Sequence, residues 1–568
     1  MKTIGSIKRY YGEHTSLCNA LLILGWLTVN LLQAGFTELT NDEAYYWMYS
    51  RNLDYGYFDH PPAIALLIKA GYALFHNEFG LRLFTVISGA FFLWFTFLLT
   101  NRRNFVVFFL LFCSVSLFES YSFIAVPDAP LLCFTAAFFL LYKRYLDTPN
   151  GWNVLLLSLC ISALMYCKYH GLLILFFTLL SNLSLFRRGS FYAVIALSVL
   201  AYFPHIAWQV VNDYPSYRYH VLTKSQDPWK PLDTLAFITG QLLVAGPLTG
   251  WFLFYASFRY KTANATERAL KFTLSGFVIF FLFSTLNAPV EANWTAAAFV
   301  PMVVLAANYT GPRKRAANLM MGLSSVSLIL FLVFRLNLAL NFAPAIGSKA
   351  FPEFYGWKKW AQEIRAKAGD TPVVFANSYQ KASKYTFYSG KTGLSLNNVQ
   401  YRRNQFDLWS IEDSLQGKRV LYIPNWETAE HGVQAFQTEK ENVLFVFIDN
   451  FRSYAKIAIT TPEPRYTFKA GSVARIPVTL HNNYPQPVTF NKNADFPDQL
   501  VCCVFRHETF TGEQLIMPLK GVVIDREFKT QLLLEVPRQK GTYYIRIAIR
   551  TGWLPSAINS RLIRVTVT

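Results

Sequence analysis

Two adjacent carboxylates, Asp42 and Glu43, follow the first long apolar run of the chain and precede the aromatic residues Tyr45–Trp47. Acidic side chains beside a membrane span are costly unless they are paired or serve a function. A carboxylate is the usual general base for removing a proton from an acceptor hydroxyl. We therefore predict that this pair supplies the base of a group-transfer reaction.

Transfer of a sugar from a lipid phosphate also needs positive charge to stabilise the departing phosphate. The candidate groups are His60, Lys168, His170, Arg218 and Lys224. The two prolines directly after His60 fix the backbone there, so its side chain is held in a defined place. Asp128, in the sequence Val-Pro-Asp-Ala-Pro, is a further candidate for substrate binding.

Each of these groups has an ordinary structural alternative. The carboxylate pair could cap a loop helix, because acidic side chains favour helix N-termini, and Asp128 could be the N-cap of a span. A lone histidine such as His170 is more often a structural loop residue than a ligand. Arg218 and Lys224 could anchor lipid headgroups. Function is favoured because all of these residues fall in loops on one side of the predicted spans.

The composition is that of a membrane protein with a water-soluble part. Of the 568 residues, 53% are hydrophobic and only 15% are charged, whereas soluble domains carry about 25% charged residues. Basic cytoplasmic loops account for the net charge of +19. The chain has no long basic run and no nucleic-acid-binding signature, so no nucleic-acid partner is expected.

Long apolar runs predict about eleven membrane spans, since a helix needs about 20 apolar residues to cross a bilayer. The predicted spans are 17–36, 80–100, 104–123, 129–142, 152–167, 170–186, 190–208, 234–257, 272–287, 294–310 and 317–340. The first run follows a basic N-terminus, but it is long enough to be a retained span rather than a signal peptide. The piece Ala63–Phe75 is too short to span and is predicted to be an interfacial helix.

Alternate connections between these spans carry the positive charge. Basic residues gather on the side of the N-terminus at 102–103, 143–144, 187–188, 259–271 and 313–315. By the positive-inside rule this side is cytoplasmic. The extracytoplasmic side receives 37–79, 124–128, 168–170, 204–231, 287–293 and everything after about residue 341. An active site at the outer membrane surface, with lipid-linked or membrane-proximal substrates, follows as a hypothesis.

The chain after the last span is predicted to form two extracytoplasmic domains. Residues 341–455 combine the helical spacing of Glu353–Ala368 with short buried-type strands, which is typical of an α/β domain. Residues 456–568 contain short alternating runs separated by Gly, Pro, Asn and Asp, which is typical of a β-sandwich. The membrane domain in this division is 1–340, with 37–79 as its first outer loop.

The first outer loop resembles that of a known family. Residues Asp42–Trp47 (DEAYYW) and Gly56–Pro62 (GYFDHPP) look like the first loop of GT-C glycosyltransferases of the dolichyl-phosphate-mannose-protein mannosyltransferase and aminoarabinose transferase type. Supporting matches follow in the family's order at 127–130, 168–171, 204–208, 293–294, 377–379 and 402–409. The resemblance covers about residues 15–450. The β-sandwich lies outside it.

This resemblance implies a polytopic GT-C fold in a bacterial inner membrane. It also implies an inverting transferase that moves a sugar from a polyprenyl-phosphate carrier to a lipid, glycan or protein acceptor. The family's essential aspartate falls on Asp42, with Glu43 as a positioning or metal-binding group. Many relatives have Lys where this chain has His60, which leaves open which group contacts the carrier phosphate. Some members bind a divalent metal, for which Asp42 and Glu43 would be the ligands, and no spacing decides whether this chain does.

The main alternative function is a polytopic transporter or flippase of lipid or glycan. A transporter would place charged or discontinuous helices at mid-membrane depth. The predicted spans are nearly free of charge, which favours the enzyme. A membrane-anchored binding protein would leave the multispan core without a purpose.

Overall fold

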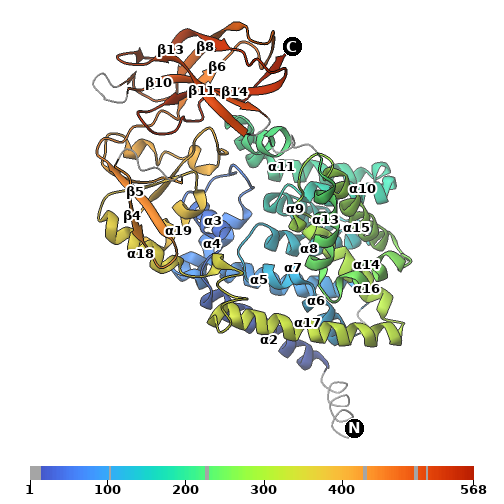
Figure 1. The fold of residues 1–568 in the computed structure, drawn as a ribbon. Helices are drawn as coiled ribbons and strands as arrows, with labels where there is room; N and C mark the ends of the chain where they lie inside the picture. Colours follow the sequence, from blue (N-terminus) through green and yellow to red (C-terminus); the bar gives the residue numbers. More distant parts are fainter. Residues whose placement is uncertain (1–14, 102–103, 224–228, 426–431, 491–496, 507–508) are drawn as a thin grey trace. The chain divides into compact units, whose positions relative to one another are not determined.

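The computed structural model describes residues 15–101, 104–223, 229–425, 432–490, 497–506 and 509–568. The chain folds as two compact units, Met1–Tyr355 and Gly356–Thr568. The first unit is helical, and all of the described strands belong to the second (Figure 1).

Capped helices joined by short turns make up the first unit. Asn77, Asn104, Asn150 and Asn264 each begin a helix with a side-chain cap, which satisfies a backbone N–H that the helix leaves unpaired. The helices are α2 Thr15–Phe36, α3 Asn41–Arg51, α4 Ala63–Leu74, α5 Glu78–Leu99, α6 Phe105–Cys113, α7 Ser116–Tyr121, α8 Asp128–Asp147, α9 Gly151–Cys167, α10 Gly171–Ser181, η1 Leu183–Arg187, α11 Gly189–Val211, α12 Pro215–Tyr217, η2 Arg218–Thr223, α13 Pro231–Ala245, α14 Gly250–Arg259, α15 Ala265–Ser284, η3 Ala292–Ala298, α16 Phe299–Thr310, α17 Lys314–Leu340 and η4 Pro352–Phe354.

Five of the described helices are long and apolar enough to cross a membrane, namely α2, α5, α8, α11 and α17. The bent pair of α13 and α14 would make a sixth span. The predicted span 272–287 lies largely in α15, an unbroken helix of 20 residues with charged residues in its first part. The remaining predicted spans correspond to shorter or broken helices, and the predicted interfacial piece is the short apolar helix α4. Several membrane-spanning helices are therefore confirmed, whereas the total of about eleven stays a prediction.

The predicted span 234–257 is wrong as a single straight helix, because α13 and α14 meet at 92°. Gly246 ends α13 with a φ of 127°. A Cβ at this position would lie 2.5 Å from the backbone oxygen of Ser114. The backbone therefore turns at a place where only glycine fits. The predicted span 104–123 is likewise divided, into α6 and α7.

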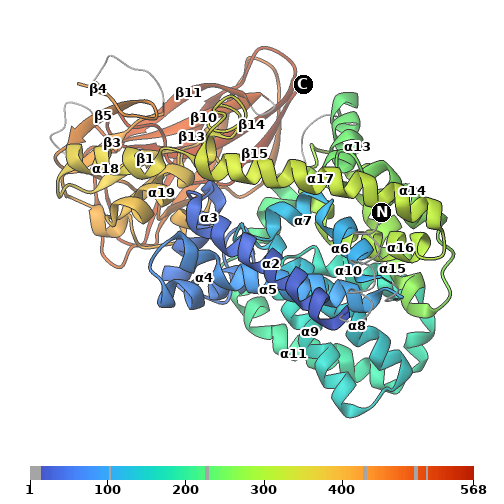
Figure 2. The ribbon, with the colours of Figure 1, turned by 90° about the horizontal axis from the view of Figure 1, so that it is seen from below.

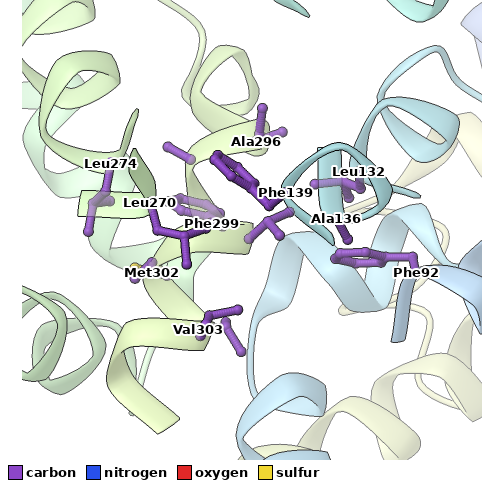
Figure 3. Close-up of a cluster of buried hydrophobic side chains, with 14 of the residues drawn as sticks. Phe92, Leu132, Ala136, Phe139, Leu270, Leu274, Ala296, Phe299, Met302 and Val303 are labelled. Atoms are coloured by element: carbon purple, nitrogen blue, oxygen red, sulfur yellow. The ribbon is translucent and has the colours of Figure 1, made fainter. Parts of the chain in front are cut away.

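The core of the helical unit lies where α5, α8, α15 and α16 meet. Figure 3 shows Phe92 from α5, Leu132, Ala136 and Phe139 from α8, Leu270 and Leu274 from α15, Ala296 from η3, and Phe299, Met302 and Val303 from α16. Nearly every residue of α16 is buried. A helix that is apolar on all sides belongs at the centre of a bundle, and α5, α6, α8, α14, α15 and α17 pack around α16.

A buried ion pair attaches the last helix of this unit, α17, to its first helices. Arg335 of α17 contacts the carboxylate of Glu119 in α7 at 2.9 Å and donates to Asn30 Oδ1 of α2 at 2.7 Å. Figures 1 and 2 both show α17 running past α2. Charged groups away from water are tolerated only with such partners, so this pair determines where α17 lies.

The second unit begins with an α/β part. It contains α18 Trp357–Ala368, β1 Val373–Ala376, α19 Tyr379–Ser389, β2 Gly393–Leu396, η5 Gln405–Asp407, η6 Asp413–Leu415, β3 Val420–Ile423, β4 Gln434–Gln437 and β5 Asn442–Ile448. The strands form one sheet in the order β2-β1-β3-β5-β4. β1 is parallel to β2 and β3, and β5 is antiparallel to β3 and β4. Trp357, Trp360 and Ile364 form the buried side of α18.

The rest of the second unit is a β-sandwich. Its strands are β6 Ile457–Thr460, β7 Arg465–Phe468, β8 Val473–Asn482, β9 Val488–Thr489, β10 Gln499–Arg506, β11 Thr509–Pro518, β12 Val523–Ile524, β13 Glu527–Glu535, β14 Gly541–Arg550 and β15 Ile563–Val567. One sheet has the order β11-β10-β14-β15-β7, a second has the order β13-β8-β6, and β12 pairs with β9. Alternate residues of each strand fill the core between the sheets. The predicted β-rich C-terminal region is confirmed.

Replacing Arg335 with Met should destabilise the protein by about 3–5 kcal/mol, because Glu119 would stay buried without its cation. Thermal unfolding of the purified protein in one detergent measures the loss. The double variant Arg335→Met with Glu119→Met removes both charges and should recover most of the stability. A double variant as unstable as the single one would contradict the ion-pair explanation.

Candidate active site

The helix that carries the two carboxylates, α3, begins with a complete capping box. Thr40 accepts the backbone N–H of Glu43 through its side-chain oxygen, and the Glu43 carboxylate accepts the N–H of Thr40 at 2.9 Å. This cap fixes the residue at which the helix starts. It places Asp42 and Glu43 in the first turn, where the helix dipole favours negative charge.

Glu43 is completely buried, and its carboxylate is held by a network of donors. Arg82 of α5 binds its two oxygens at 2.6 Å each, and the backbone N–H of Ala125 donates to it at 2.8 Å. The remaining N–H groups of Arg82 donate to the backbone oxygens of Ala34, Thr37 and Glu38. The network joins the end of α2, the start of α3, α5 and the turn before α8.

These contacts keep Glu43 charged. Burial alone would raise its pKa, but the Arg82 guanidinium and the backbone N–H groups hold the pKa of Glu43 below its usual value. Both carboxylate oxygens already accept two N–H groups each, which leaves little room for a metal ion. Among the described residues, no group of three or more His, Cys, Asp or Glu side chains could hold a metal. The geometry therefore favours the positioning role of Glu43.

Asp42 differs from its neighbour because its side chain is exposed. It interacts electrostatically with Tyr121 at the end of α7. The same tyrosine interacts with Asp128 and Glu291 and hydrogen-bonds to the side chain of Asn293. The turn before α8 lies at the N-terminus of α3, because Ala125 donates to Glu43, and Tyr121 interacts with both Asp42 and the segment after α15.

The aromatic side chains of α3 hold the second half of the first loop. Tyr45 and Tyr49 donate to the carboxylate of buried Asp59 at 2.9 and 3.4 Å. The next residue, His60, is half-buried, and its ring centre lies 5.6 Å from that of Tyr46. His60 thus packs against α3, the helix that carries Asp42, and its role in the site stays a prediction.

Helix α11 holds the tip of the same loop. His205 lies 2.7 Å from the carbonyl oxygen of Tyr55, and Trp208 donates to the Asp54 carboxylate at 2.7 Å. A Cβ at Gly56 would come within 2.4 Å of the Trp208 ring. Only glycine therefore allows the loop to approach α11 this closely.

Asp128 and Lys168 form a buried ion pair with each other. Lys168 Nζ lies 2.8 Å from both carboxylate oxygens of Asp128. Asp128 is the first residue of α8, and Lys168 directly follows α9. The structure brings these two predicted site residues together, and each compensates the charge of the other.

The other predicted cations have different surroundings. His170 is half-buried, and its ring lies 5.4 Å from Phe281 and 6.1 Å from Trp294. Arg218 pairs with the exposed Asp213 at 2.5 Å. Lys224 lies outside the described residues.

Three residues of this region escaped the sequence analysis, namely Arg82, Tyr121 and Glu353. Glu353 accepts the backbone N–H of Asn41, at the first position of α3, at 2.5 Å. Arg82 had a usable signal, because it is the one charged residue in the apolar run 80–99 and such a residue needs a partner. Tyr121 and Glu353 carried no signal, since their partners are distant in the sequence.

The chain is similar in sequence to glycosyltransferases and in fold to ArnT. The family model described as dolichyl-phosphate-mannose-protein mannosyltransferase matches residues 59–208. The chain is 24% identical over 320 residues to the lipid A galacturonosyltransferase RgtD of Rhizobium johnstonii, and this match spans 50% of the chain and 64% of that protein. Crystal structures of ArnT from Cupriavidus metallidurans, in the apo state and bound to undecaprenyl phosphate, are similar with TM-scores of 0.56 and 0.55 at 13% identity.

The matched region of the apo ArnT structure covers 76% of this chain and 98% of ArnT. The chain has the GT-C fold. Several apolar helices long enough to cross a membrane, together with this fold, make the chain an integral membrane protein. The matched share of RgtD is just under two thirds of its length, and the family model begins at Asp59, after α3.

Replacing Glu43 with Gln should destabilise the protein by about 3–5 kcal/mol, because Arg82 would remain buried without its carboxylate. The matched control is Asp42→Asn, one residue away but exposed, which should change stability by less than about 0.5 kcal/mol. Thermal unfolding in detergent measures both. Equal stability of the two variants would contradict the anchoring role of Glu43.

The stability should also depend on pH in a defined direction. Because the folded-state pKa of Glu43 is lowered, its contribution is fully present above the ordinary pKa of glutamate. It is lost as the pH falls through the lowered value, since the unfolded chain then binds more protons. The gap in unfolding temperature between the wild type and Glu43→Gln should therefore narrow on acidification. A gap that does not change with pH would show that Glu43 is not charged in the fold.

Proposed function

We propose that the protein transfers a sugar from a polyprenyl-phosphate carrier to a lipid acceptor, with inversion at the anomeric carbon. The observation that carries this proposal is the exposed Asp42 at the capped N-terminus of α3, held in place by the buried Glu43–Arg82 pair. The similarity to mannosyltransferases and to a lipid A galacturonosyltransferase supports the reaction class.

In the proposed reaction Asp42 acts as the general base. Its carboxylate accepts the proton of the acceptor hydroxyl, while the hydroxyl oxygen forms a bond to the anomeric carbon. The bond from this carbon to the phosphate oxygen breaks, and the electron pair leaves with the polyprenyl phosphate. The dipole of α3 favours the ionised form of Asp42, which is the form that accepts the proton.

The leaving phosphate requires nearby positive charge. The charge of Lys168 is neutralised by Asp128, so we propose that this pair shapes the substrate pocket. His60 and His170 are half-buried near the first loop and the turn after α15, and we assign to them contact with the phosphate. Arg218 and Lys224 remain proposed contacts of the same kind.

An apolar groove between α10 and α15 suits the prenyl chain of the carrier. Its volume is about 720 Å³, and its lining includes Phe176, Phe177, Phe272, Ile279, Phe280 and Phe283. The groove follows α15 from Lys271 to Asn287. Asn287 and Glu291 both lie in the connection between α15 and η3, so this end of the groove opens at that connection.

We also propose the class of acceptor and the membrane in which the protein lies. A lipid acceptor is favoured over a glycan or a protein because the similar RgtD is named for transfer to lipid A. The basic loops described above support a bacterial inner membrane protein whose active site and second unit face the extracytoplasmic side.

A transporter or flippase is the second candidate, and one observation favours it. The helical unit contains discontinuous helices, α6 with α7 and α13 with α14, which transporters use around their binding sites. The buried charges of Arg335 and Glu119 are paired with each other. The packing of the helices therefore accounts for these two buried charges, which weakens the transporter hypothesis.

The Asp42→Asn variant should lose transfer activity by about 100-fold or more, with unchanged unfolding temperature. The measurement is loss of a polyprenyl-phosphate sugar donor and gain of a product mass in the presence of lipid acceptor. Asp147→Asn is the matched control, since Asp147 is an exposed carboxylate at the opposite end of α8. Full turnover by folded Asp42→Asn protein would overturn the assignment of the base.

Blocking the groove should weaken the use of long-chain donors. Ile279 is 53% exposed on α15, and Ile279→Trp should raise the KM for a long-chain donor several-fold while kcat is retained, since less apolar surface is buried on binding. A donor with a short prenyl chain should be unaffected. Ile329→Trp, on the exposed side of α17, is the control. Equal KM values in all three proteins would show that the groove does not hold the carrier.

A further inference from the structure

The first turn of α3 makes one hydrogen bond to a segment that is far away in the sequence. An α-helix leaves the N–H groups of its first turn without partners inside the helix. In α3 the side chain of Thr40 accepts the N–H of Glu43. The N–H of Asn41, the first residue of the helix, donates instead to the carboxylate of Glu353 at 2.5 Å. Glu353, 312 positions later in the chain, therefore completes the cap of the helix that carries Asp42.

Contacts with the end of α17 fix the segment that carries Glu353. This residue is half-buried and belongs to the short helix η4, which follows α17 in the chain. The hydroxyl of Tyr355 donates to the carbonyl oxygen of Asn337 in α17 at 3.1 Å. The buried side chain of Asn337 also accepts the N–H of Ala343 at 2.7 Å and donates to the carbonyl oxygen of the same residue at 3.2 Å. The end of α17 therefore determines where the Glu353 carboxylate lies.

A carboxylate is well suited to this contact. Negative charge is stabilising at the N-terminus of a helix, and a charged acceptor binds a backbone N–H more strongly than a neutral one does. Asn41 directly precedes Asp42, and Glu43, which directly follows it, is held by Arg82 of α5. The residues on both sides of Asp42 are thus each bound by a group from another part of the helical unit.

We propose that Glu353 is a positioning residue for the transfer reaction, which holds Asn41 so that Asp42 keeps the orientation of a general base. This role rests on the proposed function, because it concerns Asp42 as the base. A base acts only within hydrogen-bond reach of the proton that it removes, and a small misplacement of a reacting group lowers the rate strongly. Glu353 acts through the backbone of α3, so its loss should lower kcat and leave the KM of the donor unchanged.

The test uses the full-length protein in detergent and the variants Glu353→Ala and Glu353→Gln. Glutamine keeps a side-chain oxygen that can accept the N–H of Asn41, whereas alanine has none. Lys349→Ala is the control, because Lys349 is exposed in the same connection after α17. Mass spectrometry measures backbone hydrogen exchange along the chain, including residues 38–46. Steady-state kinetics give kcat and KM for a polyprenyl-phosphate sugar donor with a lipid acceptor, and the unfolding temperature is measured for every variant.

Glu353→Ala should exchange faster at the start of α3 than the wild type does, because local opening there becomes easier. Its kcat should fall by about tenfold or more, as expected for a displaced base. The KM of the donor should stay within about twofold, since an interaction made only in the transition state is affected. Glu353→Gln should recover most of both losses, and Lys349→Ala should behave as the wild type does.

Unchanged exchange at the start of α3 in Glu353→Ala would overturn the proposal, as would an equal loss of kcat in the alanine and glutamine variants. Wild-type kcat in Glu353→Ala, together with an inactive Asp42→Asn protein, would overturn the positioning role and leave the proposed function standing. Full turnover by folded Asp42→Asn protein would instead contradict Asp42 as the base. In that case the exchange measurement still decides whether Glu353 holds the start of α3.

Discussion

The ion pair between Glu43 and Arg82 holds together the part of the helical unit on which the proposed chemistry depends. Neither side chain is exposed to solvent, so both charges carry a large desolvation cost. This cost is offset because every oxygen and every N–H direction of the pair has a partner, drawn from the end of α2, the cap of α3 and the turn before α8. Loss of one partner would leave the other buried and unmatched.

This anchor explains why two adjacent carboxylates have different surroundings. Successive residues of a helix point about 100° apart, so a helix that directs Glu43 toward Arg82 directs Asp42 elsewhere, here to solvent. Asp42 interacts electrostatically with Tyr121 at the end of α7, and the turn before α8 donates to the neighbouring Glu43. An exposed carboxylate whose helix is fixed by its neighbour's ion pair is the arrangement that the proposed base requires.

Much of the helical unit could be predicted from apolar runs, because a segment that avoids water must form its own backbone hydrogen bonds as a helix. The errors occurred where a local backbone requirement interrupts such a run. At Gly246 the chain bends at a point where the backbone of Ser114 approaches it closely. Hydropathy describes only the polarity of the side chains, so it gives no sign of such a bend. Similarly, Lys168 and Asp128 looked like separate site residues because nothing in the sequence shows that they are each other's partners.

The sequence by itself determined the membrane class, the side of the membrane predicted for the loops, the β-rich C-terminal region and the short motif that contains Asp42 and Glu43. These follow from composition and local spacing. Only the tertiary structure decided that Glu43 is buried on Arg82 and that Asp128 and Lys168 neutralise each other. Charge compensation depends on distances of a few ångströms between residues that are far apart in the chain, and only the folded chain specifies those distances.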